Sequence, residues 1–146
     1  MKNLRITEQD RFRALLRGAG FKATTARIRL LRILERAHEP LSVEKITKRL
    51  GSLAPDMATI YRSLRNLHAA GILRHVDFQH RHAHYELNDP KDHHHFTCTN
   101  CGKMVNFENC DVTKLISRVL RRTPSFSKVT EHSLELFGLC AQCAKK

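Results

Sequence analysis

The segment DMATIYRSLRNLH, residues 56–68, decides the fold of this chain. Asp56 follows a proline and can cap a helix. Apolar residues recur along that helix at helical spacing, and we expect them to face a core: Met57, Ile60, Leu64 and Leu67. Polar residues recur at the same spacing on the opposite side: Thr59, Arg62, Ser63 and Asn66. Such a helix can read base edges in the DNA major groove, although a helix that merely faces water shows the same pattern.

The neighbouring segments decide between these two interpretations. Helical periodicity precedes the segment over residues 7–17, 24–37 and 42–50. After Gly71 the pattern becomes that of strands, over residues 72–78 and 83–87, joined by the polar residues 79–82. Helices followed by a hairpin are typical of a winged helix-turn-helix, which favours DNA as the partner of the polar face.

The rest of the chain predicts a second, smaller domain. Residues 88–92 are rich in turn formers, and we place a hinge there. Beyond it, residues 103–107 and 128–139 resemble strands, and Asp111 can cap a helix between them. We therefore predict an α+β fold: a winged helix-turn-helix domain over residues 1–87, the hinge, and a small α/β domain over residues 93–146.

Charge and hydropathy restrict the class of protein. The chain of 146 residues has a net charge of +12, and residues 1–86 hold 17 Lys and Arg against 8 Asp and Glu. This excess favours a polyanion as partner of the first domain, although a basic surface with no specific partner has the same composition. Apolar runs are too short for a membrane span, and the charged N-terminus does not resemble a secretory signal. We expect a cytoplasmic protein that does not bind membranes.

Four of the five cysteines form two Cys-x-x-Cys pairs. The pairs are Cys98 with Cys101 and Cys140 with Cys143. Each pair places two thiolates on a tight turn, and two turns complete the tetrahedral shell of a structural zinc ion. Two independent redox dithiols, or four unrelated cysteines, are the alternatives, and Cys110 is left over.

Histidines are dense between residues 80 and 95. His93 and His95 alternate on a strand-like run, so their imidazoles point to one side and that of His94 to the other. Two metal sites can flank one strand in this way, unless the histidines form only a polar edge. Nitrogen and oxygen ligands suit Fe²⁺, Zn²⁺, Mn²⁺ or Ni²⁺.

A zinc hydrolase with Glu86 as general base is a competing hypothesis. The sequence carries no accompanying substrate-pocket motif, and the net charge favours DNA. We therefore predict that the chain is not an enzyme. A zinc-ribbon module with constitutive DNA binding, in which the histidines are incidental, is a further alternative.

Four separated motifs resemble, in order, the ferric uptake regulator family. They are GFKATTAR at 20–27, ATIYRSL at 58–64, HHHFTCTNCG at 93–102 and EHSLELFG at 131–138. The resemblance spans nearly the whole chain. It implies a homodimer, held together by residues 93–146, that binds a palindromic AT-rich operator in double-stranded DNA. It also implies a divalent metal as corepressor and genes of metal uptake or oxidative defence as targets.

The resemblance assigns roles to individual residues. Lys22 matches a basic residue near DNA, and Tyr61 and Arg62 match the pair on the recognition helix, where Thr59 shares the polar face. Arg27 matches a residue that is structural or directed at phosphate. The four paired cysteines match the structural zinc ligands, in agreement with their spacing.

The resemblance also implies a regulatory metal site at the junction of the two domains. Glu86, His93 and His95 match its ligands. The family usually adds a histidine two residues before the cap of the third helix, where this chain has Pro40. His38 and the wing histidine His82 are equally good replacements, His80 and His84 are further candidates on the wing, and family precedent favours His38.

A third metal site is implied on the opposite side of the strand. Its candidate ligands are Asp92, His94, Glu108 and His132. Asn106 stands where the family has a carboxylate, which weakens this site and also the interpretation as a peroxide sensor. Some zinc-responsive members carry a sensing cysteine at the position of Asn88. The lack of that thiol favours iron as the regulatory metal, with zinc- and peroxide-responsive regulation as alternatives.

Overall fold

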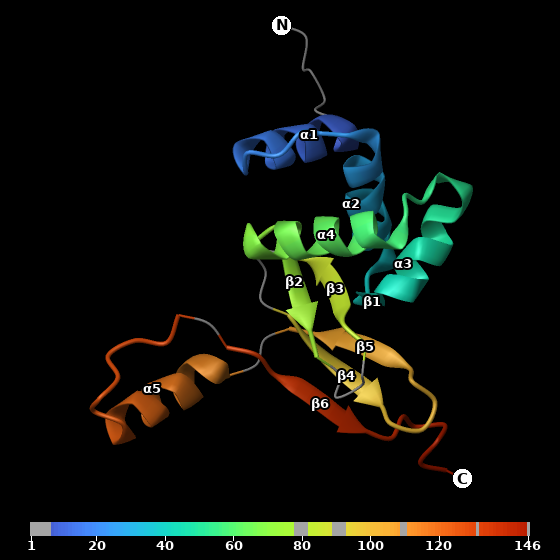
Figure 1. Cartoon of the computed structure of the whole chain (residues 1–146). Coiled ribbons are helices and arrows are strands. Elements are labelled where there is room, and N and C mark those ends of the chain that lie inside the picture. The colour runs from blue at the N-terminus through green and yellow to red at the C-terminus, as the bar shows by residue number, and fades with distance from the viewer. Residues whose placement is uncertain (1–6, 78–81, 89–92, 109–110, 131, 146) are drawn as a thin grey trace, which may run out of the picture. The chain divides into compact units, whose positions relative to one another are not determined.

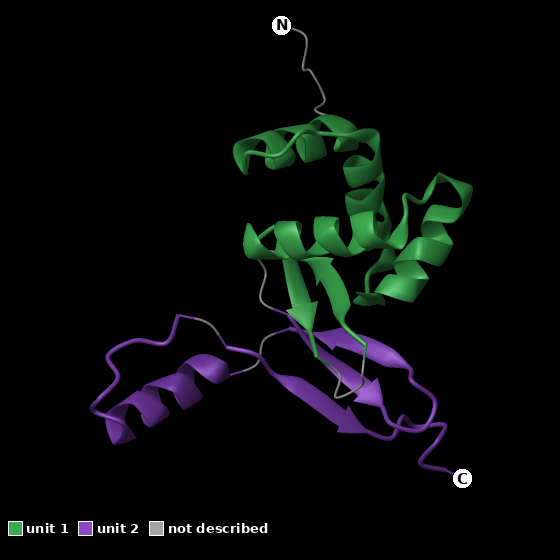
Figure 2. Ribbon diagram, in the orientation of Figure 1, with its two compact units in different colours: residues 1–88 green, residues 89–146 purple. Residues whose placement is uncertain are grey.

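Two compact units make up the chain, and we describe each by itself. The computed structural model describes residues 7–77, 82–88, 93–108, 111–130 and 132–145. The first unit is Met1–Asn88 and the second is Asp89–Lys146 (Figure 2). The predicted hinge, apart from Asn88, lies outside the described residues. Within the described part, no helix is long and apolar enough to cross a bilayer.

The first unit begins with helices that start at capping residues. They are α1 Glu8–Gly18, α2 Thr25–Ala37, α3 Val43–Leu50, the short 3-10 helix η1 Gly51–Leu53 and α4 Met57–Ala69 (Figure 1). The side chains of Thr7, Thr24, Ser42 and Asp56 each accept a hydrogen bond from a backbone N–H of the first turn that follows. These bonds satisfy backbone N–H groups that have no partner inside the helix, and they therefore stabilise each helix at its first turn. The predicted starts of these helices are confirmed.

The core of the first unit forms where the four α-helices bury their apolar stripes. Its fully buried side chains include Phe12, Leu16, Leu31, Ile46, Ile60, Leu64 and Leu67. The prediction that Met57 faces this core is wrong, because its side chain is 46% exposed. Met57 is the first residue of α4, one turn before the first buried residue of that helix, Ile60, and its sulfur accepts a hydrogen bond from the Thr47 hydroxyl.

A three-stranded antiparallel sheet completes the first unit. Its strands are β1 Leu41–Ser42, β2 Leu73–Val76 and β3 His84–Leu87, in the order β1-β3-β2. The predicted hairpin is confirmed, while the tip at residues 78–81 lies outside the described residues. Arg74 and Glu86 are partners across the hairpin. The strand β1 has only two residues, too few for a period in the sequence to reveal it.

The second unit holds another three-stranded sheet and one helix. The elements are β4 His94–Cys98, β5 Met104–Phe107, α5 Val112–Arg122 and β6 Glu135–Gly138. In the order β5-β4-β6, β5 pairs antiparallel and β6 parallel with β4. Helices with a hairpin wing, followed by this α/β unit, give the α+β class that the sequence predicts.

One local prediction for the second unit is wrong, and another is confirmed in part: a helix does start directly after Asp111, but without the expected cap bond. The strand predicted over residues 128–139 pairs only at Glu135–Gly138, because β4 offers five residues for pairing and residues 128–130 are exposed. Asp111 precedes α5 without a side-chain cap bond, and its carboxylate instead pairs with Lys114 Nζ at 3.1 Å.

Candidate metal centres and nucleic-acid interface

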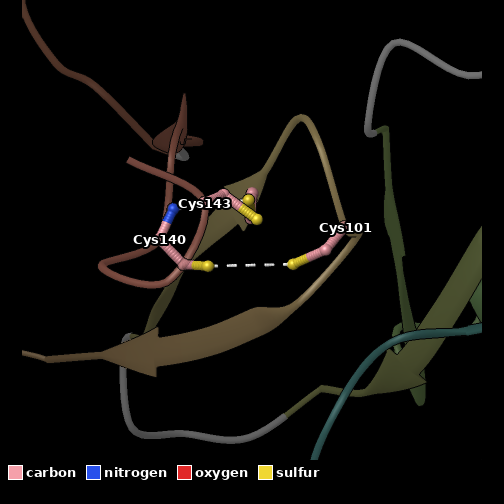
Figure 3. A group of neighbouring side chains, drawn as sticks. Cys101, Cys140 and Cys143 are labelled. Carbon is pink, nitrogen blue, oxygen red and sulfur yellow. Dashed lines mark hydrogen bonds between the residues drawn. The ribbon is translucent and has the colours of Figure 1, made fainter. Parts of the chain in front are cut away.

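Two turns of the second unit bring four sulfur atoms together. Cys98 ends β4 and Cys101 lies in the turn to β5, while Cys140 and Cys143 lie in the turn after β6. All four Sγ atoms lie within 4.8 Å of one another, and those of Cys101 and Cys140 are 3.8 Å apart (Figure 3). Gly102 closes the first turn with φ of 72°, a conformation that favours glycine.

Backbone N–H groups favour the thiolate form of two of these cysteines, Cys98 and Cys140. Hydrogen bonds from the backbone of Cys101 and Cys140 lower the pKa of Cys98 to about 6. The backbone of Cys143 lowers the pKa of Cys140 in the same way. For Cys143 a hydrogen bond with Asn100 lowers the pKa, but the neighbouring thiols and burial outweigh it and raise the pKa to about 11. A thiol with a lowered pKa gives up its proton more readily, and only the deprotonated form of cysteine binds a metal ion.

The sulfur arrangement fits a tetrahedral zinc ion. A Zn–S distance of about 2.3 Å places neighbouring sulfurs of a tetrahedron about 3.8 Å apart. Two independent dithiols would not require all four sulfurs in one cluster. Four thiolates leave no open coordination position, so the cluster suggests a structural zinc site rather than a catalytic one.

The three consecutive histidines face two sides of β4. The rings of His93 and His95 have centroids 5.2 Å apart. The ring of His94 instead lies 5.4 Å from Phe107 and 5.3 Å from His132. Two imidazoles that bind one ion through N–metal bonds of about 2.1 Å have centroids about 5 Å apart, so His93 and His95 fit a shared divalent ion.

A carboxylate from β6 lies beside His95. Glu135 is the parallel partner of His95, and its Oε1 lies 3.2 Å from His95 Nδ1. Glu135 lies within the motif EHSLELFG, and its sequence context predicts no role for it. Only the register between β4 and β6 could have revealed the pair, because the two residues are 40 positions apart.

Glu86 is part of the first unit and is buried on β3. Its Oε1 accepts a hydrogen bond of 2.7 Å from Arg74 Nε and a second bond from Nη2 of the same guanidinium. The carboxylate charge is therefore compensated within the wing. His38 ends α2 in the left-handed conformation with φ of 51°, and its side chain is exposed. The side chain of His82 is also exposed.

The candidate third site is brought together in part. His94 and His132 are neighbours, as described above. Glu108 follows β5 and is exposed, and among the described residues it joins no group of three potential ligands. Asp92 lies outside the described residues. Asn106 is the partner of His95 across β4 and β5, so it lies away from the position opposite His94.

The polar side of α4 is accessible to a large partner. Tyr61 is 53% exposed and Arg62 is exposed beside it. Thr59 has a second role that the sequence did not show, because its hydroxyl donates a hydrogen bond of 2.6 Å to Asp56 Oδ2 and its N–H donates to Oδ1. Both bonds lower the pKa of Asp56, and the bond from the Thr59 hydroxyl has the larger effect. They also keep the Asp56 side chain in its capping position.

The loop before α2 presents Lys22 near the start of α4. Arg27 Nη1 donates a hydrogen bond of 2.9 Å to the Lys22 carbonyl, and its guanidinium stacks on Phe21 at 5.2 Å. A cavity of about 310 Å³ separates the starts of α2 and α4 and is lined in part by Lys22, Arg27 and Thr59. Arg27 thus supports the loop that carries Lys22. Of the two roles expected for Arg27, structural or directed at phosphate, this contact agrees with the structural one.

A winged helix-turn-helix joined to a unit with clustered metal ligands defines a metal-responsive DNA-binding regulator. The model of the Ferric uptake regulator family matches residues 18–137. The chain therefore belongs to the ferric uptake regulator family, whose members are transcription regulators and not enzymes.

Individual members of the family are similar to this chain over most of their own length. The chain is 34% identical to the ferric uptake regulation protein of Legionella pneumophila over 131 residues, which is 88% of this chain and 95% of that one. The crystal structure of the Vibrio cholerae ferric uptake regulator matches with a TM-score of 0.75 and 28% identity, covering 88% of this chain and 98% of the other. The ferric uptake regulator from Francisella tularensis, solved with iron, gives a TM-score of 0.73 at 25% identity and covers 86% and 96%.

Proposed function

We propose that the chain is an iron-responsive repressor of metal homeostasis genes, with Fe²⁺ as corepressor. The observation that carries the proposal is the pair His93 and His95, which offers nitrogen ligands to a divalent ion in a unit where four thiols form a separate cluster. Relatives at about a third identity are named ferric uptake regulation proteins. As a DNA-binding regulator the protein would act in the cytoplasm.

Metal sensing would link the two units. In this proposal Glu86 and His38 from the first unit bind the same ion as His93 and His95 from the second, with residues 88–92 as the hinge. The ion would favour the closed arrangement of the units over the open ones, and the population would shift accordingly. The hydrogen bonds from Arg74 to Glu86 Oε1 would weaken, because the carboxylate would then also bind a divalent cation.

DNA binding would use the exposed residues of the first unit. Tyr61 and Arg62 would contact base edges in the major groove, while Lys22 would contact the neighbouring minor groove. Thr59 would contribute through its cap as well as through its place on the polar face. The net charge of +12 favours association with the phosphate backbone.

We also propose a third metal site formed by Asp92, His94, Glu108 and His132. The distance of 5.3 Å between the rings of His94 and His132 supports two of these ligands. Glu108 would have to turn toward them for the ion to bind. The site would then lie on the side of β4 that is opposite to the regulatory ion.

Metal-dependent DNA binding tests the proposed function. The protein, with zinc kept at the cysteines and the labile metal removed by a mild chelator, is titrated anaerobically with Fe²⁺, Mn²⁺ or Zn²⁺ against a labelled palindromic AT-rich duplex. Affinity for the duplex should rise at least about tenfold with Fe²⁺, because closure brings both recognition helices to successive half-sites. Equal affinity with and without metal would contradict sensing and would favour constitutive DNA binding. A rise with Zn²⁺ alone would favour zinc-responsive regulation, and loss of binding on peroxide treatment would favour peroxide sensing.

A homodimer through the second unit is part of the proposal. Within the described part, α5 buries none of its residues, and large apolar side chains stay exposed across this unit. They are Val105, Leu115, Val119, Phe126, Val129, Leu136 and Leu139. A monomer seldom leaves so many apolar side chains in water, and a self-complementary interface would cover them.

Charge on α5 should separate the proposed dimer. Leu115→Glu and Val119→Glu each bury a carboxylate in the interface, and we expect each variant to run as a monomer at micromolar concentration in analytical ultracentrifugation. Ser117→Glu adds the same charge on another face of the helix and serves as the control. A dimer that persists in both apolar variants would place the interface elsewhere.

A further inference from the structure

We infer that Glu135 is a positioning residue of the regulatory metal site: it holds the Nδ1–H of His95 and thereby leaves Nε2 of that ring as the metal ligand. The inference rests on the proposed function, since it takes His95 as a ligand. It adds a residue from the third strand of the sheet, to which neither the sequence nor the proposed ligand set gives a role.

The pairing of β4 with β6 fixes the geometry of this contact. His95 and Glu135 are partners in the parallel ladder, and Nδ1 lies 3.2 Å from Oε1. His95 is fully buried, and the Glu135 side chain is 16% exposed. A carboxylate held this far from water beside a buried imidazole makes a stronger contact than the same pair on the surface.

Hydrogen-bond chemistry decides which nitrogen carries the proton. An ionised carboxylate can only accept, so the nitrogen that faces Glu135 must donate. A neutral imidazole has a single N–H, and with that proton on Nδ1 the Nε2 lone pair is available for a cation. Histidines that bind metals usually donate their other N–H to such a carboxylate or carbonyl, which fixes the ring and makes the ligand nitrogen more basic.

The position of Glu135 indicates a supporting role rather than direct coordination. Glu135 joins no group of three or more potential ligands whose ligand atoms lie within 4.8 Å of one another, among the residues that the structure describes. His93 approaches the ring of His95 to 5.2 Å and is the neighbour with which that ring fits a shared ion. The second oxygen, Oε2, is buried and has no hydrogen-bond partner in the described part of the chain. The hydrogen bond that the structure gives to this carboxylate is therefore the one between its Oε1 and His95.

Removal of this carboxylate should weaken metal binding without abolishing it. Loss of such a partner typically costs about 10-fold to 100-fold in metal affinity. We expect a loss in this range for Glu135→Leu, measured with a competing chromophoric chelator and Mn²⁺ or Zn²⁺ as the probe. Glu135→Gln keeps an oxygen acceptor of the same shape, and it should recover most of the affinity.

The metal-free protein gives an independent measurement. Nitrogen-15 NMR of histidine-labelled protein, with zinc at the cysteines and no other metal, should show His95 with its proton on Nδ1. In Glu135→Leu that tautomer should no longer dominate, whereas Glu135→Gln should retain it. Asp111→Asn removes a carboxylate from an exposed position of the same unit and should change neither the tautomer nor the affinity. Bound zinc at the cysteines serves as the check that each variant is folded.

The outcomes separate this inference from the proposed function. His95→Ala that binds the probe metal as tightly as the wild type would overturn the site itself. If His95→Ala loses the metal while Glu135→Leu keeps the wild-type affinity and tautomer, the site stands and the role of Glu135 is wrong. If Glu135→Leu abolishes binding as completely as His95→Ala, Glu135 is a direct ligand, which also overturns its positioning role.

Discussion

Replacement of Cys98 by serine is expected to remove the tightly held zinc and to unfold the second unit. Cys98 is the most enclosed of the four thiols, and its sulfur also accepts a hydrogen bond of 3.3 Å from the Cys140 backbone. The sheet of this unit has three strands of four or five residues, and α5 buries none of its own residues. So small a structure has little apolar area to bury, and zinc binding of about 10 to 16 kcal/mol would provide most of its folding free energy.

Zinc content and residual structure measure this result. We expect the purified variant to hold less than a tenth of the wild-type zinc, and amide NMR signals of the second unit to collapse while those of α1 to α4 remain. Cys110→Ser, which removes the cysteine outside the two pairs, is the matched control and should keep its zinc. A Cys98→Ser protein with full zinc and an intact second unit would show that three thiolates suffice or that the cluster has no structural role.

Replacement of Arg62 by alanine is expected to abolish high-affinity DNA binding. Arg62 is exposed on α4 and is not needed for the core, so the fold should remain. A side chain that reads a base edge contributes about 1 to 3 kcal/mol, and a dimer loses two copies at once. The combined loss of roughly 2 to 6 kcal/mol corresponds to an affinity loss of at least about 30-fold.

The pattern of the loss distinguishes base reading from general attraction. Arg62→Ala should reduce affinity for the palindrome much more than for unrelated DNA, and the specificity ratio should fall with it. Arg121→Ala removes an exposed arginine from α5 in the second unit, on the face of Ser117, and should leave this ratio unchanged. Fluorescence anisotropy at two salt concentrations measures the affinity of each variant for the palindrome and for unrelated DNA, and hence its specificity ratio. Equal losses on specific and unrelated DNA would assign Arg62 to the phosphate backbone instead.

Features with a local cause could be predicted from the sequence. The starts of α2 and α4 depend on Thr24 and Asp56, which bond to backbone groups only three residues away. The cysteine pairs show in their own spacing that each turn can hold two corners of a tetrahedron. Such signals need no knowledge of the rest of the chain, and the structure confirms the helix starts and the cluster that the four cysteines form.

Features with a distant cause could not be predicted. Glu135 gains its importance from the register of β6 against β4, which no short stretch of sequence encodes. Met57 has the spacing of a core residue, but it is the first residue of α4 and its side chain is 46% exposed, which helical spacing alone does not reveal. The strand predicted over residues 128–139 is short because pairing, rather than propensity, sets its limits.

The ladder between β4 and β6 has a cysteine turn at one end and the histidines of the proposed regulatory site at the other. His95 and Cys98 are three residues apart on β4, about 10 Å along a strand. A shift of one residue between the two strands would turn Glu135 away from His95. Zinc held by the four cysteines would join the end of β4 to the turn after β6. It would thereby fix the register of the two strands and the side chain that faces His95. Oxidation or loss of the cysteines would therefore disturb the strand register and separate Glu135 from His95. The protein would then stop responding to metal while its DNA-binding unit stayed folded.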